Sequence, residues 1–430
     1  MTDTDISPTA AVDHFLSSLK RPVRLLVAIS GGSDSTGLLL ALAKAIRTRA
    51  DSDISLCAAT VDHALRAASA GEALEVAALC ARHSIPHVIR RWEDDKPLSG
   101  VAAAARLARY RLLADAAAEL HADAIVTAHT RDDQEETIAM RSARNGDEDA
   151  LGLAGMAPAT LYGGKTWILR PFLACRREAI RSFIRQEGEG WIDDPSNIDP
   201  HYERVRTRFS LASIPPKPDL TAKAAERRCN LSSAAAELLA SHGTIHANAV
   251  AQLDHEALLG RNEVLRYMLG GLLAVIGGVS HRPGTAVMDK VMAFTAKGFG
   301  RMTASRCLLQ RRREGLFIMR EHRAILPLVL RPGEAGIWDG RFFARNGGSV
   351  SATIETGIEA ETQIAAYPLP SSISRHMAHI LPRNAPEDVQ ITAVAPHFDQ
   401  FLPEYDLAFA NAVAKLMARP PYPPPPRASC

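Results

Sequence analysis

Two consecutive stretches decide the fold: Arg24-Leu25-Leu26-Val27-Ala28-Ile29-Ser30-Gly31-Gly32-Ser33-Asp34-Ser35 and Thr36-Gly37-Leu38-Leu39-Leu40-Ala41-Leu42. The first apolar run predicts a strand, the small residues a tight turn, and the second apolar run a helix. A turn of small residues lets backbone N–H groups approach phosphate oxygens, and the helix N-terminus adds partial positive charge. The sequence therefore predicts a phosphate-binding turn between a strand and a helix.

Asp34 indicates that a metal ion accompanies the phosphates. A carboxylate repels a bare phosphate, whereas Mg²⁺ favours carboxylate, water and phosphate oxygens together. We therefore expect Asp34 to bind magnesium within a magnesium-nucleotide site. The residues expected to hold the nucleotide phosphates are Ser30, Gly31, Gly32, Ser33, Asp34 and Ser35.

Other phosphate loops do not match this turn. No lysine follows Gly32, as a kinase-type loop requires, and the third glycine of the dinucleotide fingerprint is missing. Gly164-Lys165-Thr166 resembles the end of a kinase-type loop, but Ala159 stands where its first glycine would be, and a strand-like run follows. An ordinary polar turn is the simpler alternative, which the combination Ser-Gly-Gly-x-Asp-Ser disfavours.

The composition is that of a globular protein with more than one domain. The chain has 430 residues, 47% of them hydrophobic and 23% charged, with a net charge of +2. Its six cysteines include no Cys-x-x-Cys pair, which favours a reducing compartment and argues against zinc or iron–sulfur sites. Residues 1–10 are polar, and no run approaches a membrane span, so we expect a cytoplasmic protein.

Strands alternate with helices in the first half of the chain. This alternation predicts an α/β fold with a doubly wound, mostly parallel sheet, in which ligands bind at the carboxyl ends of the strands. The expected strands are Leu25–Ile29, Ile54–Val61, His87–Ile89, Ala124–Ala128 and Trp167–Arg170, and the expected helices are Thr36–Arg49, Gly71–His83, Val101–His121, Asp132–Arg144 and Arg176–Glu187.

The second half predicts smaller C-terminal domains after a proline-rich break at Ser213–Pro218. We expect helices at Leu220–His242 and Asn262–Ala274, a helix in the basic stretch Arg301–Arg313, a strand at Leu316–Arg320, and a β-rich unit from Ile325 onward. Arginines crowd at Arg170–Arg228 and Arg301–Arg323, which fits either a nucleic-acid footprint or solvated helix faces. The expected domains are 15–212, 220–324 (mainly helical), 325–415 (small C-terminal) and 416–430 (disordered, proline-rich).

A second polar motif, Ala128-His129-Thr130-Arg131-Asp132-Asp133-Gln134-Glu135-Glu136-Thr137, ends one strand and begins the next helix. Helical spacing stacks Asp132 with Glu136 and Asp133 with Thr137. Helix capping by Thr130 and Asp133 accounts for part of this pattern. A histidine and several acids at the carboxyl edge of a strand exceed what capping needs, so we favour a functional role.

The turn resembles the PP-loop of the ATP pyrophosphatases, which split ATP between its α and β phosphates. The second motif is similar to His-x-x-Asp-Asp-x-x-Glu-Thr of the tRNA(Ile)-lysidine synthetase family. Further segments resemble the same family over about the first 211 residues: Val61–Arg66 with Ser69, Ala105–Tyr110, Arg170–Leu173, Trp191–Asp199, and the residues Tyr202, Arg204, Arg206 and Arg208.

The resemblance implies an ATP-dependent and magnesium-dependent ligase. Such an enzyme adenylates the C2 oxygen of the wobble cytidine in isoleucine tRNA with a CAU anticodon, and the side-chain amine of L-lysine then displaces AMP. It implies that Asp133 and Glu136 handle lysine or the metal, that His129 positions the cytidine, and that Arg109 and Arg206 stabilise the adenylate or contact RNA. Together with Asp34 these are the expected catalytic residues. The resemblance also implies that 15–212 is the catalytic domain and that 220–324 binds tRNA. No membrane partner is expected, and a homodimer is left open.

The chain departs from the family pattern at two places. Val205 and Thr207 replace an asparagine and a branched apolar residue, and Asn145–Ala150 replaces an Arg-Gly-x-Gly turn. These changes concern RNA or lysine contacts and leave the ATP site intact. Two other functions stay open: a PP-loop enzyme that thiolates a tRNA base, which the cysteine spacing opposes, and an inactive RNA-binding module.

Overall fold

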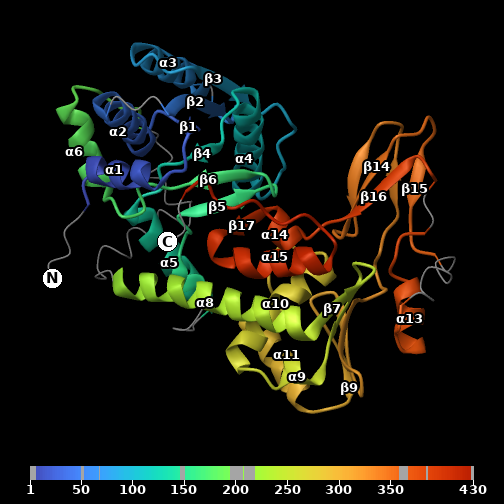
Figure 1. The fold of residues 1–430 in the computed structure, drawn as a ribbon. Coiled ribbons are helices and arrows are strands. Elements are labelled where there is room, and N and C mark those ends of the chain that lie inside the picture. The colour runs from blue at the N-terminus through green and yellow to red at the C-terminus, as the bar shows by residue number, and fades with distance from the viewer. Residues whose placement is uncertain are drawn as a thin grey trace. The chain divides into compact units, whose positions relative to one another are not determined.

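A computed structural model of the protein describes residues 6–49, 53–66, 68–145, 151–193, 207, 218–357, 367–383 and 386–427. The chain divides into two compact units, Met1–Ala225 with Pro424–Cys430 (unit 1) and Glu226–Pro423 (unit 2). Their elements are labelled in Figure 1. Within the described ranges, no helix is both long enough and apolar enough to cross a membrane.

Unit 1 alternates strands and helices, as the sequence predicts. Its strands are β1 (Val23–Ala28), β2 (Ile54–Asp62), β3 (His87–Arg91), β4 (Ala124–Val126), β5 (Ala159–Tyr162) and β6 (Thr166–Leu169). Its helices are α1 (Pro8–Ser18), α2 (Ser33–Arg49), α3 (Ser69–Arg82), α4 (Val101–Glu119), α5 (Arg131–Asn145), the 3₁₀ turn η1 (Leu151–Ala154) and α6 (Arg177–Gln186). Helix α8 (Pro218–His242) runs across the division between the units.

The strands of unit 1 pair in the order β5-β6-β4-β1-β2-β3. All neighbours are parallel except β5, which is antiparallel to β6. Because β1 lies between β2 and β4, the chain leaves β1 toward one edge of the sheet and later returns on its other side. The expectation of a doubly wound α/β fold is confirmed, and its switch point lies between β1 and β4.

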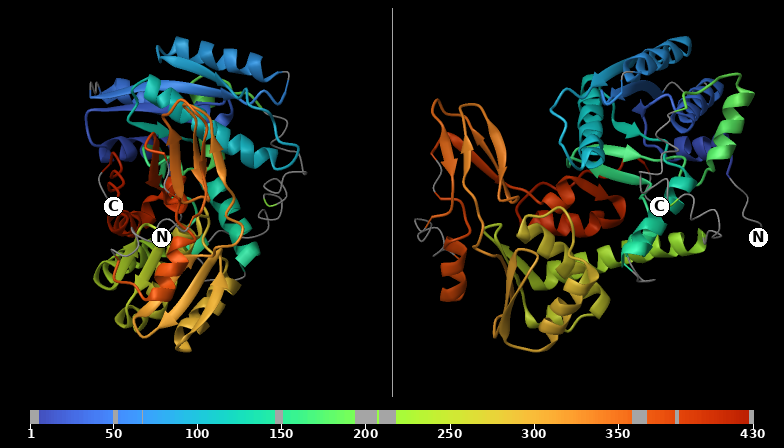
Figure 2. Two further views of the ribbon diagram at one scale, coloured as in Figure 1. Left: turned by 90° about the vertical axis from the view of Figure 1, so that its right-hand side faces the viewer. Right: turned by 180° about the vertical axis from the view of Figure 1, so that it is seen from behind.

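Helices cover both faces of this sheet. Helices α2 and α6 pack on each other on one face, and α1 packs against both. Helix α4 packs across β2, β3 and β4 on the opposite face (Figures 1 and 2). The central strands are mostly apolar, and Leu25, Leu26, Val27 and Ile125 are fully buried, as is typical of parallel strands covered on both faces.

The strand β5 was missed by the sequence analysis. It forms a hairpin with β6 in which Tyr162 pairs with Thr166, and the connecting Gly163 and Gly164 both have positive φ angles. A strand of four residues shows too little alternation to be recognised from sequence. Lys165 therefore lies in a hairpin turn before a strand, which confirms that Gly164-Lys165-Thr166 is not a phosphate loop.

Unit 2 is built around antiparallel sheets. Strands β7 (Gly243–His246), β8 (Val250–Leu253), β11 (Gly315–Arg320), β10 (Cys307–Arg312) and β9 (Gly300–Ala304) form one sheet in that order. Strands β13 (Ala335–Trp338), β14 (Phe342–Asn346) and β16 (Val389–Ala393) form a second, and β12 (Leu328–Leu330) pairs with β15 (Ala352–Ile354). The remaining elements are α9 (His255–Leu258), α10 (Asn262–Gly277), α11 (Thr285–Ala296), α13 (Ser371–Ala378), α14 (Pro396–Asp399), β17 (Phe401–Pro403), η4 (Glu404–Asp406) and α15 (Leu407–Leu416).

The helix expected at Arg301–Arg313 is wrong, because this stretch forms the hairpin β9–β10. Ala304 pairs with Cys307, and the two residues between them, Ser305 and Arg306, both have positive φ angles. Two left-handed residues make the tight turn that matches the twist of a hairpin. The arginines gave the stretch a helix-like composition, but Cys307 and Leu309 face the core with strand spacing.

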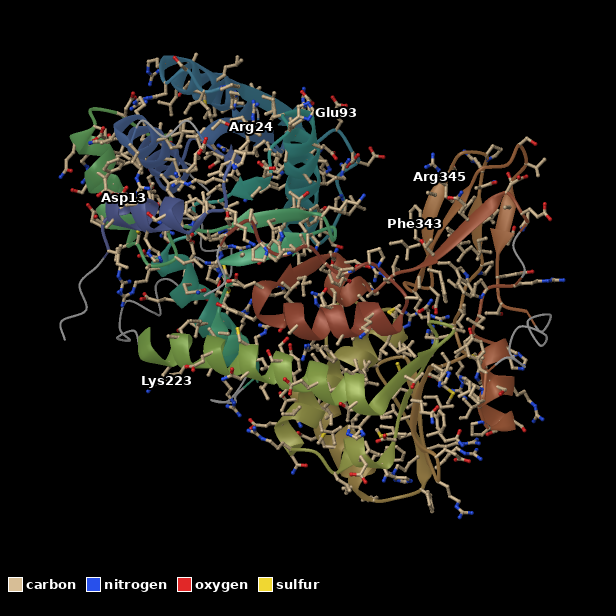
Figure 3. All side chains as sticks on the ribbon, in the orientation of Figure 1. Asp13, Arg24, Glu93, Lys223, Phe343 and Arg345 are labelled. Carbon is tan, nitrogen blue, oxygen red and sulfur yellow. The ribbon has the colours of Figure 1, made fainter. Side chains whose placement is uncertain are left out.

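One apolar cluster joins residues on both sides of position 325. Phe317 and Met319 of β11 pack with Trp338 and Phe342 and with the helix α13. Along β14 the side chains alternate, with Phe342 buried and Phe343 and Arg345 exposed on the other face (Figure 3). The expected domain limits at 212, 324 and 415 stay a prediction.

The chain beyond α15 is packed as far as Arg427, although its composition marks it as disordered. Tyr422 is buried and its hydroxyl donates to Oδ1 of Asp399 at 2.6 Å. Arg427 forms a β-bridge with Leu19, and Lys20 N donates to the carbonyl of Pro426 at 3.1 Å. A buried aromatic ring and backbone pairing hold this proline-rich segment, which has few amide donors of its own.

We predict that Gly37→Ala destabilises the contact between α2 and α6. A methyl group at Gly37 would collide with Cγ2 of Ile180 and reach Cδ1 of Ile184 at 3.5 Å. Overpacking of this kind lowers the free energy of unfolding by about 1–3 kcal/mol. The better helix propensity of alanine offsets up to about 1 kcal/mol of this loss. Hydrogen exchange of the α2 amides should show a lower free energy of opening.

Gly71→Ala is the matched control. Gly71 also lies near the start of a helix, α3, but a methyl group there meets no atom within 4 Å. This variant should keep or raise stability, by up to about 1 kcal/mol. Equal stability of the two variants would contradict close packing at Gly37.

Candidate active site

The two motifs singled out in the sequence lie at the switch point of the sheet. The turn Ser30–Ser35 follows β1, and the segment His129–Asp133 follows β4, which is the parallel neighbour of β1. Ligands of doubly wound sheets bind where the carboxyl ends of such neighbouring strands diverge. The strand order therefore brings the phosphate turn and the acidic start of α5 to one site.

The turn itself is shaped by a close approach at Gly31. Gly31 has a φ angle of +85°, and its carbonyl accepts a hydrogen bond from Ile192 N at 2.9 Å. A Cβ atom at this position would lie 2.7 Å from Cδ1 of Ile192 and 3.0 Å from Cγ2 of Val76. Glycine is needed here both for the left-handed conformation and for the space.

Hydroxyl groups and the start of α2 line the turn. Oγ of Ser30 and Oγ of Ser35 lie 3.2 Å apart, and Ser35 also donates to the carbonyl of Gly32. Oγ of Ser33 donates to Oδ1 of Asp34 at 3.2 Å. Because α2 begins at Ser33, its first amides have no carbonyl one turn earlier to bond and are directed toward the turn. The arrangement suits a bound phosphate chain.

The acids at the start of α5 have different bonding partners. Asp133 forms a capping box with Thr130: its Oδ2 accepts from Thr130 N at 2.9 Å, and Thr130 Oγ1 accepts from Asp133 N at 3.3 Å. Oδ2 of Asp132 accepts the first amide of α6, that of Arg177, at 2.8 Å. Glu135 pairs with two arginines, at 3.2 and 2.8 Å. Glu136 is only 2% exposed. The capping interpretation thus holds for Asp133, and its functional role stays a prediction.

A residue that the sequence analysis missed, Arg177, connects the two motifs. Its Nε donates to Oδ2 of Asp34 at 3.0 Å and its Nη2 to Oδ1 of Asp133 at 3.2 Å. The neighbouring turn of α6 places Arg181 Nε 3.4 Å from Oγ of Ser33. Many arginines lie between positions 170 and 228, and no sequence signal shows which of them faces the site.

The charges of this group depend on one another. Burial raises the pKa of Asp34, and the Arg177 guanidinium opposes that rise. Burial alone would lower the pKa of Arg177, but Asp34 and Asp133 together raise it above its usual range. Asp34 therefore bears a partly buried charge that is stabilised by a cation.

The described residues contain no cluster of three histidine, cysteine or acidic side chains that could hold a metal ion alone. Asp34 is a carboxylate of the kind that Mg²⁺ prefers, and it lies in the first turn of α2, within the turn Ser30–Ser35. The residues fit a cation whose other ligands are phosphate oxygens and water. They do not fit a cation bound without a nucleotide.

The loop that follows Gly146–Ala150 is tied to α5. Gln134 Nε2 donates to the carbonyl of Met156 at 3.0 Å, and Met156 N donates back to Oε1 of Gln134 at 2.6 Å. Arg141 Nη1 donates to the carbonyl of Gly155 at 2.7 Å. These bonds fix the helix that presents Asp133.

Arg109 and His129 lie on neighbouring elements of the same sheet edge. Arg109 of α4 donates through Nε to Nε2 of His63, which follows β2, at 3.3 Å. Nδ1 of His129 lies 3.0 Å from Thr127 Oγ1. Arg206 lies outside the described residues, as do Asp194–Asp199, Tyr202, Arg204, Val205 and Arg208, so their roles stay predictions.

The arginine cluster of unit 2 is only partly a surface feature. Arg320 is 2% exposed and contacts both oxygens of Asp339 at 3.0 Å, and Arg306 pairs with the same carboxylate. Arg301, Arg313 and Arg323 are exposed. A nucleic-acid footprint on the exposed arginines stays a prediction, whereas Arg320 is part of the packed interior.

We predict that the lowered pKa of His63 makes the free energy of unfolding decrease at acidic pH. Burial, and after it the charge of Arg109, lowers the pKa of His63 to about 4 from an ordinary 6.5. As the pH falls below 6.5 the unfolded chain therefore binds a proton before the folded one does, and stability is lost progressively down to pH 4. His63→Gln should reduce the loss between pH 7.5 and pH 5 by about 1 kcal/mol, a value discounted for solvent screening.

Urea unfolding at the two pH values measures this difference. His14→Gln, at an exposed position on α1, is the control. A pH dependence unchanged by His63→Gln would show that His63 is protonated equally readily in both states.

Comparisons with known proteins agree with this arrangement. The model of the PP-loop domain family matches residues 6–214. A tRNA(Ile)-lysidine synthase of Rhizobium meliloti (strain 1021) is 41% identical, with 97% of this chain and 98% of that protein covered. One of Mesorhizobium japonicum is 38% identical, with 93% and 94% covered. A solved U34-tRNA thiolase, NcsA from Methanococcus maripaludis, aligns with a TM-score of 0.42 and 16% identity over 51% of this chain and 77% of that one. With near-complete coverage at these identities and a PP-loop at the switch point of its sheet, the chain belongs to the tRNA(Ile)-lysidine synthase family.

Proposed function

We propose that the protein joins L-lysine to C2 of the wobble cytidine in isoleucine tRNA with a CAU anticodon, using ATP and Mg²⁺ in the cytoplasm. The proposal rests on one observation. The phosphate turn and the acids of α5 lie together at the β1/β4 switch point, where Arg177 contacts both Asp34 and Asp133. Family membership supplies the reaction class. The residues supply the places for a triphosphate, a divalent cation and an ammonium group.

The first step transfers AMP to the tRNA. The C2 oxygen of the cytidine attacks the α-phosphorus of ATP, and pyrophosphate leaves with the bonding electron pair. Serine hydroxyls and the first amides of α2 would hold the phosphates, and Asp34 would hold a magnesium ion, which would supply charge neutralisation at the leaving pyrophosphate. Arg109 and Arg206 are proposed to stabilise the adenylate, and His129 to position the cytidine.

The second step forms the carbon–nitrogen bond. Asp133 pairs with the lysine ammonium and aligns its nitrogen, and after loss of one proton to a nearby base the amine attacks C2. AMP leaves with the former C2 oxygen, and the remaining proton is released. Glu136, which is buried in α5, is proposed to add negative charge near Asp133 and so to favour the ammonium.

The described cysteines do not support thiolation of a base. Cys57, Cys80, Cys175 and Cys307 are buried, and burial raises the pKa of Cys80 to about 11 and that of Cys307 to about 12. A sulfur carrier requires an accessible thiolate or a cluster. Cys229 is exposed on α8, but it belongs to unit 2, whereas the phosphate turn belongs to unit 1.

We predict that Asp34→Asn keeps the fold but lowers tRNA-dependent pyrophosphate release by about 100-fold to 1,000-fold, because magnesium loses its carboxylate ligand. Pyrophosphate release and circular dichroism measure the two properties. Glu187→Gln, which removes an acid paired with Lys44 at 2.5 Å on the surface of unit 1, should leave the rate unchanged. A near-normal rate for folded Asp34→Asn would refute the magnesium assignment.

We predict that Asp133→Asn separates the two steps. Asparagine keeps an oxygen for the capping box but loses the charge that holds the ammonium, so lysine incorporation should fall about 100-fold while pyrophosphate release changes less than about threefold. Glu136→Gln should act in the same direction. Glu135→Gln, which alters the neighbouring acid, is the matched control and should leave both rates near normal.

Labelled lysine and mass analysis of digested tRNA test the product directly. The modified cytidine should gain the mass of lysine less one water and should form with no other amino acid. Labelled sulfur in the product, or no modification while AMP is made, would defeat the proposed reaction.

A further inference from the structure

Arg177 lies between two carboxylates, those of Asp34 and Asp133. The proposed function assigns an external cation to each of them, a magnesium ion to Asp34 and the lysine ammonium to Asp133. The guanidinium of Arg177 contacts Asp34 at 3.0 Å and Asp133 at 3.2 Å, and its side chain is 18% exposed. The two acids are also largely covered, with side chains 23% and 14% exposed. One partly buried cation thus pairs with two partly buried anions.

We propose that Arg177 is the resident counter-ion of this site, which makes binding of a divalent cation at Asp34 dependent on nucleotide. Arg177 is a positioning residue in this role. The inference rests on the proposed function in one respect, the assignment of magnesium to Asp34.

The charge balance of the free protein supports this role. Asp34, Asp133 and Arg177 together have one net negative charge, which gives a divalent cation little attraction. A cation at Asp34 would also lie beside the guanidinium and be repelled by it. Without Arg177 the same position would face two carboxylates, which is the oxygen-rich environment that divalent cations prefer.

A nucleotide changes this balance. Its phosphates bring several negative charges to the turn beside Asp34, and they offer the guanidinium a ligand whose geometry matches its fork. Arg177 can then turn from Asp34 to a phosphate oxygen, and the metal takes its place on the carboxylate. The exchange keeps each charge paired throughout.

The position of Arg177 in the fold favours a movement of the side chain alone. Its backbone N–H is bound to Oδ2 of Asp132, and the helix that it begins packs on α2 through Ile180 and Gly37. The two carboxylates belong to the starts of α2 and α5. Only the flexible part of the arginine has to move between ligands.

Binding of Mn²⁺ to the full-length protein, followed by electron paramagnetic resonance of the free ion, tests the proposal. Without nucleotide, Arg177→Met should bind Mn²⁺ at least tenfold more tightly than the wild type. Arg177→Lys keeps the positive charge and should bind as weakly as the wild type. Arg177→Gln serves as a second neutral variant if Arg177→Met does not fold.

Arg176→Met is the matched control, because Arg176 is the adjacent residue and also pairs with an acid of α5, Glu135 at 2.8 Å. It should bind Mn²⁺ like the wild type. Unchanged Mn²⁺ affinity in both neutral Arg177 variants would overturn the counter-ion role, and so would equal tightening in Arg176→Met.

A second arm separates this inference from the proposed function. With a non-hydrolysable ATP analogue, the wild type should bind Mn²⁺ tightly and Asp34→Asn should not. If Asp34→Asn binds as well as the wild type, the magnesium assignment fails, whatever the Arg177 variants do. If Asp34→Asn loses binding while the neutral Arg177 variants behave as wild type without nucleotide, only the counter-ion role fails.

Discussion

The parallel pairing of β1 with β4 is the constraint on which the rest of unit 1 depends. These two strands are far apart in sequence, and their pairing sets Leu25 opposite Ala124 and Val27 opposite Val126. The phosphate turn and the start of α5 follow the carboxyl ends of these two strands and consequently lie side by side. A sheet with another strand order would contain the same motifs without bringing them to one place.

The sequence predicted the local features of this site and missed the tertiary ones. A strand, a glycine turn and a helix within residues 24–49 are encoded by neighbouring residues, so their pattern could be recognised directly. The bridge formed by Arg177 could not, because the direction of an arginine on α6 depends on how α6 packs against α2. The hairpin β9–β10 was mistaken for a helix because arginine-rich composition outweighed a short strand period.

In α5, the structural roles of the acids do not exclude the functional role that is proposed for the motif. Asp132 binds an amide of α6, Glu135 binds two arginines, and Asp133 caps its own helix while also contacting Arg177. One carboxylate has two oxygens, and in Asp133 each oxygen has a separate partner. Capping therefore fixes the orientation of the oxygen that faces the site.

The close contact between Ile192 and Gly31 gives the protein an internal optical probe. Trp191 is the preceding residue. The Cζ atoms of Arg181 and Arg185 lie over its ring, 5.7 and 5.6 Å from the ring centroid. The other three tryptophans, Trp92, Trp167 and Trp338, are each at most 3% exposed. A displacement of Gly31 would be transmitted through this hydrogen bond to Ile192 and to Trp191, which among the described residues is the one partly exposed tryptophan. The intrinsic fluorescence of the unmodified protein would consequently detect such a displacement without an added label.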